Sequence, residues 1–411
     1  VAMVAPVVAD AGDDVDPLSG LSIDAADLLL LVGLLALTLM VNNMLQKRAV
    51  PVPEAISTIA VGVVAGALAT LFPQVNRGTF QKLEDQAARE FLLVFIAPII
   101  FAEGYGMKSR QFFDNFFRIC VHAFLGTLIS AVIVAAMLFY VVPHLGGGEL
   151  DRLSLAECLA FGAMISSTDP VTTLAIFKQQ QMVERGLGYL YYSVLGESIL
   201  NDAVAITLFD SFAALVDEGS EFTAGEAFRI FTSFCGSFLA STAMGVAGGC
   251  FTALVLKFAR LGSGDNEEDN FYFNVPEIGV ALVLAYLPFL AAEATGFSGI
   301  VAIMFAGITA RRYAHYNLTD VTRQVFLPTV ELLASLCETY VFVVLGLGVF
   351  LLRGAYSAPV ILCAMGGCLL GRAAHVYPCS MAVNRCSTAK SLSRPEQHVV
   401  WFAGLRGAVA F

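Results

Sequence analysis

The chain has 411 residues, of which 57% are hydrophobic and 14% are charged, and its formal net charge at pH 7 is −11. Soluble proteins are about 45–50% apolar and about 25% charged. The composition therefore argues against a soluble enzyme, a nucleic-acid-binding protein, a secreted disulfide scaffold and a disordered protein. The lipid bilayer is the expected solvent and partner, and nucleic acid is not an expected partner.

The chain opens with a polar, acidic lead-in at residues 1–23, which lacks the basic start and long apolar core of a signal peptide. We expect this segment on the luminal or extracellular side. Apolar runs of spanning length then alternate with short polar gaps. We predict an all-α polytopic membrane protein with twelve spans, at about 24–46, 54–72, 89–106, 113–142, 155–178, 187–215, 227–259, 275–292, 296–313, 324–352, 356–382 and 397–411. The last run is still apolar at Phe411, so we expect the natural protein to continue.

The Lys and Arg residues predict how the spans are oriented. With the N-terminus outside, the inside loops hold fifteen of the 23 Lys and Arg residues and the outside loops hold six. This excess fits the positive-inside rule and supports the span count, because one missed span would scramble it. The glycosylation pattern Asn317-Leu318-Thr319 falls on the inside, so we expect it to be unmodified.

The sequence contains no familiar metal or phosphate motif. The nine cysteines include no CxxC pair, and the five histidines include no HExxH pattern. We therefore expect structural or solvated histidines, cysteines that act as small buried hydrophobes, and no cofactor. Two glycine pairs, Gly62 with Gly66 and Gly367 with Gly371, have the spacing that lets helices pack closely.

The sixth span carries a polar stripe that reads GESILND at residues 196–202. On a helix, Glu197 and Asn201 lie four residues apart, as do Ser198 and Asp202, so their oxygens face one side. A charge at bilayer depth costs about 2.5–3.5 kcal/mol on insertion scales, which requires a partner, a wet cavity or a function. Because such oxygens suit hard cations, we predict an ion site here. A stripe that only locks helices together is the alternative.

Two other spans contain helix breaks beside charges. The fifth span reads SSTDP at 166–170, where the proline removes a backbone donor and Thr168 or Asp169 can cap the helix that restarts. The twelfth span has Arg406 between two glycines. Interrupted spans in matching halves predict an inverted-repeat transporter with two crossing helices. Its first repeat would run from about 24 to 215, a linker helix from 227 to 259, and a second repeat from 275 to 411, truncated before its last helix. A simple proline kink is the alternative at the first break. The other candidate charges at bilayer depth are Glu103, Glu338 and Arg372.

These segments resemble the sodium/proton exchanger family of monovalent cation:proton antiporters. The matching stretches, in family order, are FIAPIIFAEGY at 95–105, STDPV at 167–171, GESILNDAV at 196–204, ETYVF at 338–342 and GLRGA at 404–408. One such motif would be weak evidence, but five in the same order, spread over nearly the whole chain from residue 24, are specific for the family. One departure is Ala97-Pro98, where many members have two prolines. WFAGLR at 401–406 and Phe177 resemble the endosomal and Golgi branch more than the plasma-membrane branch.

The resemblance implies a fold of thirteen helices, of which twelve are present here, and a homodimer whose regulators bind a cytosolic tail that is missing. It also implies the site. Asp202 resembles the ion-carrying carboxylate, Asn201 its neighbour in the electroneutral branch, and Thr168 a residue suited to ion ligation. Glu197 with Arg372, and Asp169 with Arg406, resemble two supporting ion pairs.

From these residues we expect a transporter and not an enzyme. Burial lets Asp202 hold either a proton or a Na⁺ or K⁺ ion, but not both, and a bare carboxylate is penalised at mid-membrane. That predicts electroneutral exchange. The alternatives are an electrogenic cation transporter or cation channel, an intramembrane aspartyl protease using Asp169 and Asp202, and a sensor or structural protein. Asn201 beside Asp202 argues against a second charge per cycle, and so against electrogenic transport. The aspartyl protease is disfavoured because the only Gly-x-Gly-Asp pattern, at 262–265, lies in a polar loop and not in a span.

Overall fold

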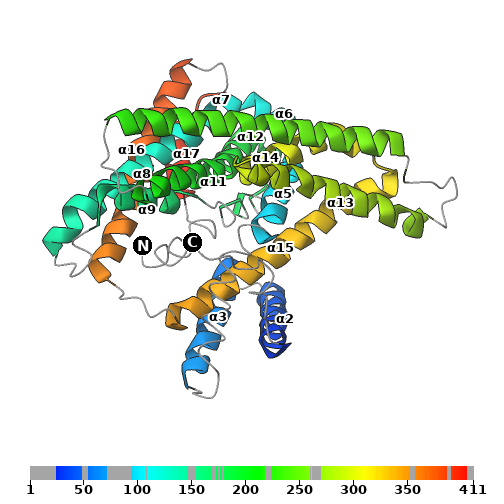
Figure 1. Ribbon diagram of the computed structural model, residues 1–411, viewed down its shortest axis with the longest axis horizontal. Helices are drawn as coiled ribbons and strands as arrows, with labels where there is room; N and C mark the ends of the chain where they lie inside the picture. The colour runs from blue at the N-terminus through cyan, green and yellow to red at the C-terminus, as the bar shows by residue number, and fades with distance from the viewer. Residues whose placement is uncertain are drawn as a thin grey trace. The chain divides into compact units, whose positions relative to one another are not determined.

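A computed structural model describes residues 25–48, 54–71, 94–107, 109–145, 153–168, 173–174, 176–177, 180–217, 224–259, 261, 270–351, 357–386 and 390–404 (Figure 1). Every regular element in these ranges is a helix, as predicted. The helices of nine or more residues are α2 (Ala25–Lys47), α3 (Glu54–Leu71), α5 (Ile96–Gly106), α8 (Thr127–Ala136), α9 (Leu155–Ile165), α11 (Gly188–Asp217), α12 (Ala224–Ala259), α13 (Asn270–Ala294), α14 (Gly299–Thr309), α15 (Asp320–Leu351), α16 (Ala358–Cys386) and α17 (Arg394–Phe402).

Each predicted span contains one of these helices. Among the described residues, six helices are long and apolar enough to cross a membrane, namely Phe116–Leu145, Val183–Val216, Phe228–Ala259, Val275–Ala294, Asp320–Val349 and Ala358–Cys386. The first of them joins the short α7 (Phe116–Cys120) to α8 through wider helical turns. The chain divides into two compact units, residues 1–99 with 331–355, and residues 100–330 with 356–411.

The first unit is held together by close helix crossings. A Cβ atom on Gly62 of α3 would lie 2.4 Å from the backbone oxygen of Val343 on α15, and one on Gly66 would lie 2.9 Å from that of Leu347. Only glycine allows this approach, so the predicted packing role of the first glycine pair is observed. Asn42 of α2 is buried and donates to Thr58 of α3 at 3.1 Å, which joins these two helices.

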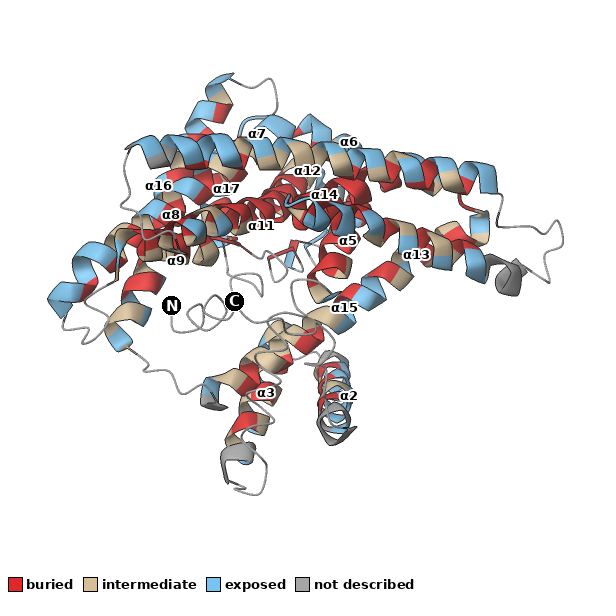
Figure 2. Cartoon of the chain, in the orientation of Figure 1, coloured by how far each residue is buried: buried red, intermediate tan, exposed pale blue. Residues whose placement is uncertain are grey.

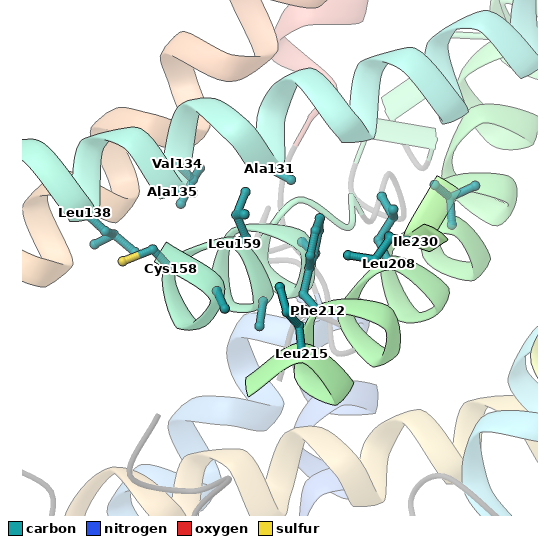
Figure 3. Packing of buried hydrophobic residues seen from close by; sticks show 14 of the residues in the cluster. Ala131, Val134, Ala135, Leu138, Cys158, Leu159, Leu208, Phe212, Leu215 and Ile230 are labelled. Atoms are coloured by element: carbon teal, nitrogen blue, oxygen red, sulfur yellow. The ribbon is translucent and has the colours of Figure 1, made fainter. Parts of the chain in front are cut away.

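The second unit is built around α11. Of the candidate spans, Val183–Val216 has the largest buried share, 61% of its most apolar window, and Figure 2 shows α11 mostly buried. One face of α11 packs with α8, α9 and α12 into the apolar cluster of Figure 3, where Phe212 and Leu208 lie beside Leu159 and Ile230. The second glycine pair, Gly367 and Gly371 on α16, lies against α8. A Cβ atom at these positions would come within 3.2 and 3.0 Å of backbone Cα atoms of that helix.

The predicted linker helix is a single helix of 36 residues, α12, the long green helix of Figure 1. Its glycines face two neighbours. A Cβ atom on Gly245 would lie 2.2 Å from the carbonyl oxygen of Ala302 on α14, and one on Gly248 would lie 2.3 Å from the ring of Pro288 on α13. Elsewhere α12 exposes Leu239 and Leu254, with exposed fractions of 69% and 53%, as expected of a face that contacts lipid.

The close crossing of α12 and α14 leads to a stability prediction. Gly245→Ala places a methyl group against backbone that cannot move aside, and we expect it to lower stability by about 1–3 kcal/mol. The control is Gly236→Ala on the same helix, because a Cβ atom there meets nothing within 4 Å. The thermal unfolding midpoint of the purified protein in detergent is the measurement. Equal midpoints for the two variants would contradict this packing.

Candidate ion site

The site begins where α9 ends. This helix starts with a capping box between Ser154 and Glu157 and ends at Ile165. The backbone N–H of Ser166 then donates to the carbonyl of Ala163 at 3.2 Å, which closes a tight last turn, and Ser167 and Thr168 are not helical. The helix therefore stops just before the Asp-Pro pair in the sequence, and this leaves backbone groups at 166–168 that need partners from other helices.

Three residues of α11 supply those partners. Ser198 donates its hydroxyl to the carbonyl of Thr168 at 2.7 Å. The side-chain amide of Asn201 donates to the hydroxyl of Thr168 at 2.8 Å and lies 3.3 Å from the carbonyl of Ser166. Asp202 accepts a hydrogen bond from the hydroxyl of Ser167. The non-helical segment is thus bound to one face of α11 by side-chain hydrogen bonds.

The site is shielded from solvent. Thr168, Ser198 and Asn201 are each 3% exposed, and Asp202 is 6% exposed. A carboxylate buried this deeply is stable only when it is hydrogen-bonded, protonated or paired with a cation. The residues bonded together here carry hydroxyl, backbone carbonyl and carboxylate oxygens. That is the ligand set that hard cations prefer.

Thr127, at the start of α8, orients the Asn201 amide. No sequence pattern points to this residue, because threonines are common in apolar spans. The carbonyl of Ser166 can only accept, so the Asn201 nitrogen must face it. The Asn201 oxygen consequently faces Thr127, whose single hydroxyl proton is shared between that oxygen and the carbonyl of Ala123. Both N–H groups of Asn201 are turned toward the 166–168 segment. In this arrangement Asn201 stabilises the end of α9, and its oxygen is not available to an ion.

Glu197 belongs to a different cluster from the other residues of the predicted stripe. It pairs with Arg372 of α16, and the two side chains are 5% and 4% exposed. The Arg372 guanidinium also donates to the carbonyl of Val400 on α17 at 2.9 Å. A Cβ atom on Gly404 would lie 2.5 Å from the Arg372 side chain, so this glycine leaves the room that the arginine occupies. One buried cation therefore connects α11, α16 and α17.

Two buried histidines complete this cluster. Glu197, His122 and His375 hold ligand atoms that lie within 4.8 Å of one another, as a metal site would require. However, Arg372 donates to Glu197, and its same nitrogen lies 3.4 Å from Nε2 of His375. Because a guanidinium only donates, Nε2 must be unprotonated, and Nδ1 donates its proton to the Gly371 carbonyl at 3.0 Å. The guanidinium is thus the cation bonded to Glu197, and His375 is held in place by hydrogen bonds.

The remaining predicted residues lie apart from this site or outside the described residues. Asp169 and Arg406 lie outside them. Glu103 is half-buried on α5, and Glu338 is half-buried on the part of α15 that belongs to the first unit. Arg118, one of the fifteen charges counted for the inside loops although it falls at the start of the span predicted at 113–142, lies on α7 and is 2% exposed. It donates to Asn115, to Ser193 and to the carbonyl of Lys390.

Comparisons with known proteins place these features in a family. Residues 32–411 match the family model described as "Sodium/hydrogen exchanger, transmembrane". The chain is 32% identical over 376 residues to sodium/hydrogen exchanger 8 of Homo sapiens, covering 91% of this chain and 62% of that protein. It is 38% identical over 327 residues to sodium/hydrogen exchanger 7 of Homo sapiens, covering 78% of this chain and 43% of that protein. The chain therefore spans less than two thirds of the length of these curated relatives.

A solved structure has the same fold. The sodium proton antiporter MjNhaP1 from Methanocaldococcus jannaschii matches with a TM-score of 0.66 and 18% sequence identity, over 93% of this chain and 84% of that chain. At this identity the likeness concerns the fold. It supports the predicted antiporter architecture for the chain.

Proposed function

Because the chain belongs to the sodium/hydrogen exchanger family, we propose that this integral, multi-pass membrane protein exchanges a monovalent cation for protons, with Asp202 as the group that carries either ion. The observation that carries the proposal is a carboxylate, 6% exposed, that accepts from Ser167 in the non-helical segment after α9, while the carbonyl of Thr168 in that segment accepts from the same helix, α11. A proton or a cation can each neutralise Asp202, whereas the bare carboxylate is strongly penalised in a buried setting. The site then switches between facing one side of the membrane and facing the other only when a proton or a cation is bound to Asp202.

One-for-one exchange follows from the neighbour of Asp202. Asn201 carries no titratable proton, and its amide is committed to Ser166 and Thr168. A single carboxylate then carries one charge in each direction, and the cycle moves no net charge. Na⁺ and K⁺ are the candidate cations, and a homodimer with regulators of a longer cytosolic tail belongs to the same proposal.

The test is proton flux in sealed vesicles that contain the purified protein. We expect an imposed Na⁺ or K⁺ gradient to move protons in the opposite direction, with a rate that saturates with the cation concentration. Under balanced gradients, an electrical potential across the membrane should leave this flux unchanged. A reversible current would reject electroneutral exchange, and a current without saturation would indicate a channel.

The orientation of Asn201 leads to a second prediction. Thr127→Val removes the donor that faces the Asn201 oxygen, and leaving a buried acceptor unpaired costs about 1–3 kcal/mol. We expect a lower thermal midpoint and a higher apparent KM for the cation, with both recovered in Thr127→Ser. Thr207→Val is the matched control, because Thr207 is also buried and bonds to the carbonyl four residues earlier in its helix, as Thr127 does, but within the described residues its side chain makes no bond to another helix. An unchanged KM in Thr127→Val would reject the orienting role.

A further inference from the structure

A cavity lies between the end of α16 and the start of α17, away from the ion site residues. Its volume is about 270 Å³, and its lining consists of Tyr377, Met381, Asn384, Arg385, Arg394 and Gln397. Tyr377, Met381, Asn384 and Arg385 come from the last turns of α16, and Arg394 and Gln397 from the first turns of α17. The two arginines therefore face one cavity from two different helices.

The walls of this cavity are fixed by hydrogen bonds that do not involve the arginines. The Asn384 side chain donates to the carbonyl of Leu392 at 2.9 Å and accepts from its N–H at 2.8 Å. Gln397 donates to the same carbonyl at 3.0 Å. These bonds hold the chain before α17 against α16. Arg385 and Arg394 line the cavity but take no part in these bonds, and both residues are exposed.

The charge around the cavity is positive and not balanced. Within the described residues, neither Arg385 nor Arg394 forms an ion pair. Glu396 is the sole acidic residue after Glu338 in the sequence. Its carboxylate accepts from the backbone N–H of Ser393 at 2.7 Å and from the hydroxyl of Tyr189 on α11, so it is already engaged. Two guanidinium groups thus share a preformed cavity that contains no acidic lining residue.

We propose that this cavity binds a phosphate group, with Arg385 and Arg394 as its charged ligands. Guanidinium groups bind phosphate oxygens in pairs of parallel hydrogen bonds. The Tyr377 hydroxyl in the lining is hydrogen-bonded to Nδ1 of His398 at 2.8 Å, so the two arginines carry the binding. Because the cavity lies where α16, a candidate span, ends, the phosphate can come from the headgroup of an anionic lipid or from a soluble phosphate compound. A bound phosphate would bridge α16 and α17. This inference does not rest on the proposed exchange function.

The test measures thermal unfolding of the purified full chain with two probes. One probe is phosphatidylinositol monophosphate in phosphatidylcholine–detergent micelles, and the other is inorganic pyrophosphate in micelles without anionic lipid. We expect the lipid to raise the midpoint by roughly 2–5 °C. Arg385→Gln combined with Arg394→Gln should remove at least half of that rise. The control pair, Lys257→Gln with Arg312→Gln, removes two exposed charges beside two other loops predicted on the same side and should keep the rise.

The outcomes separate the two sources of phosphate. A rise with lipid alone assigns a headgroup site, and a rise with pyrophosphate as well assigns a site for phosphate in general. In both cases the rise must depend on the two arginines. An equal rise in the double variant, or no rise with either probe in the unmodified protein, would overturn the proposal. Because no readout uses ion flux, failure of exchange would not alter these outcomes.

Discussion

Replacing Asp202 with asparagine is expected to abolish cation-driven proton flux in vesicles while leaving the protein folded. Asparagine has nearly the same shape and can still accept from Ser167, so the packing against the end of α9 is retained. It can bind neither a proton nor a cation in the way a carboxylate does, because it carries no charge to neutralise. Flux and the thermal midpoint, measured on the same preparation, separate loss of transport from loss of fold.

The control for this variant lies on the same helix. Asp210→Asn makes the identical chemical change at an exposed position two turns further along α11 and should retain full exchange. If Asp202→Asn transported at the rate of the unmodified protein, Asp202 would not be the carrier. If both variants lost flux, the defect would reflect charge on α11 in general, and the specific assignment would fail.

The second large effect concerns Arg372. Arg372→Ala is expected to destabilise the protein by about 3–5 kcal/mol, because it leaves the Glu197 carboxylate buried without its cation. It also removes the donor to the Val400 carbonyl. Thermal unfolding in detergent is the measurement, and Arg312→Ala, at an exposed arginine, is the control.

Rescue distinguishes a true pair from two independent buried groups. Glu197→Gln in the Arg372→Ala background removes the uncompensated charge and should restore part of the lost stability. The contact with Val400 stays lost, so recovery should be incomplete. Additive losses in the double variant would show that the two residues do not stabilise each other.

Much of the fold could be predicted from sequence because the bilayer imposes a simple pattern. Each of the twelve longer helices among the described residues overlaps a predicted span, and the glycine spacing at Gly62 and Gly367 located two close crossings. The residues of the candidate site could also be selected, because a carboxylate in an apolar helix is rarely without a role. These signals are local, and each can be read from one segment alone.

Contacts between segments were harder to predict. The spacing in 196–202 gave one stripe, yet Glu197 bonds to α16 while Ser198 and Asn201 bond to the end of α9. Helical periodicity gives the direction of a side chain but not its neighbour. Thr127 could not have been found in this way, since a lone threonine in an apolar span carries no pattern. Arg118 was counted with the inside-loop charges, and its contacts with Ser193 and Lys390 come from distant parts of the chain.

The guanidinium of Arg372 has a mechanical consequence. Its planar group is bonded to Glu197 of α11 and to Val400 of α17, while its own backbone belongs to α16. Separating any two of these helices would break a charge-assisted hydrogen bond in an apolar medium, where water cannot take the place of the lost partner. The three helices should therefore travel as one rigid body. A conformational change that moves a buried ion from one side of the membrane to the other must therefore have its hinges outside α11, α16 and α17.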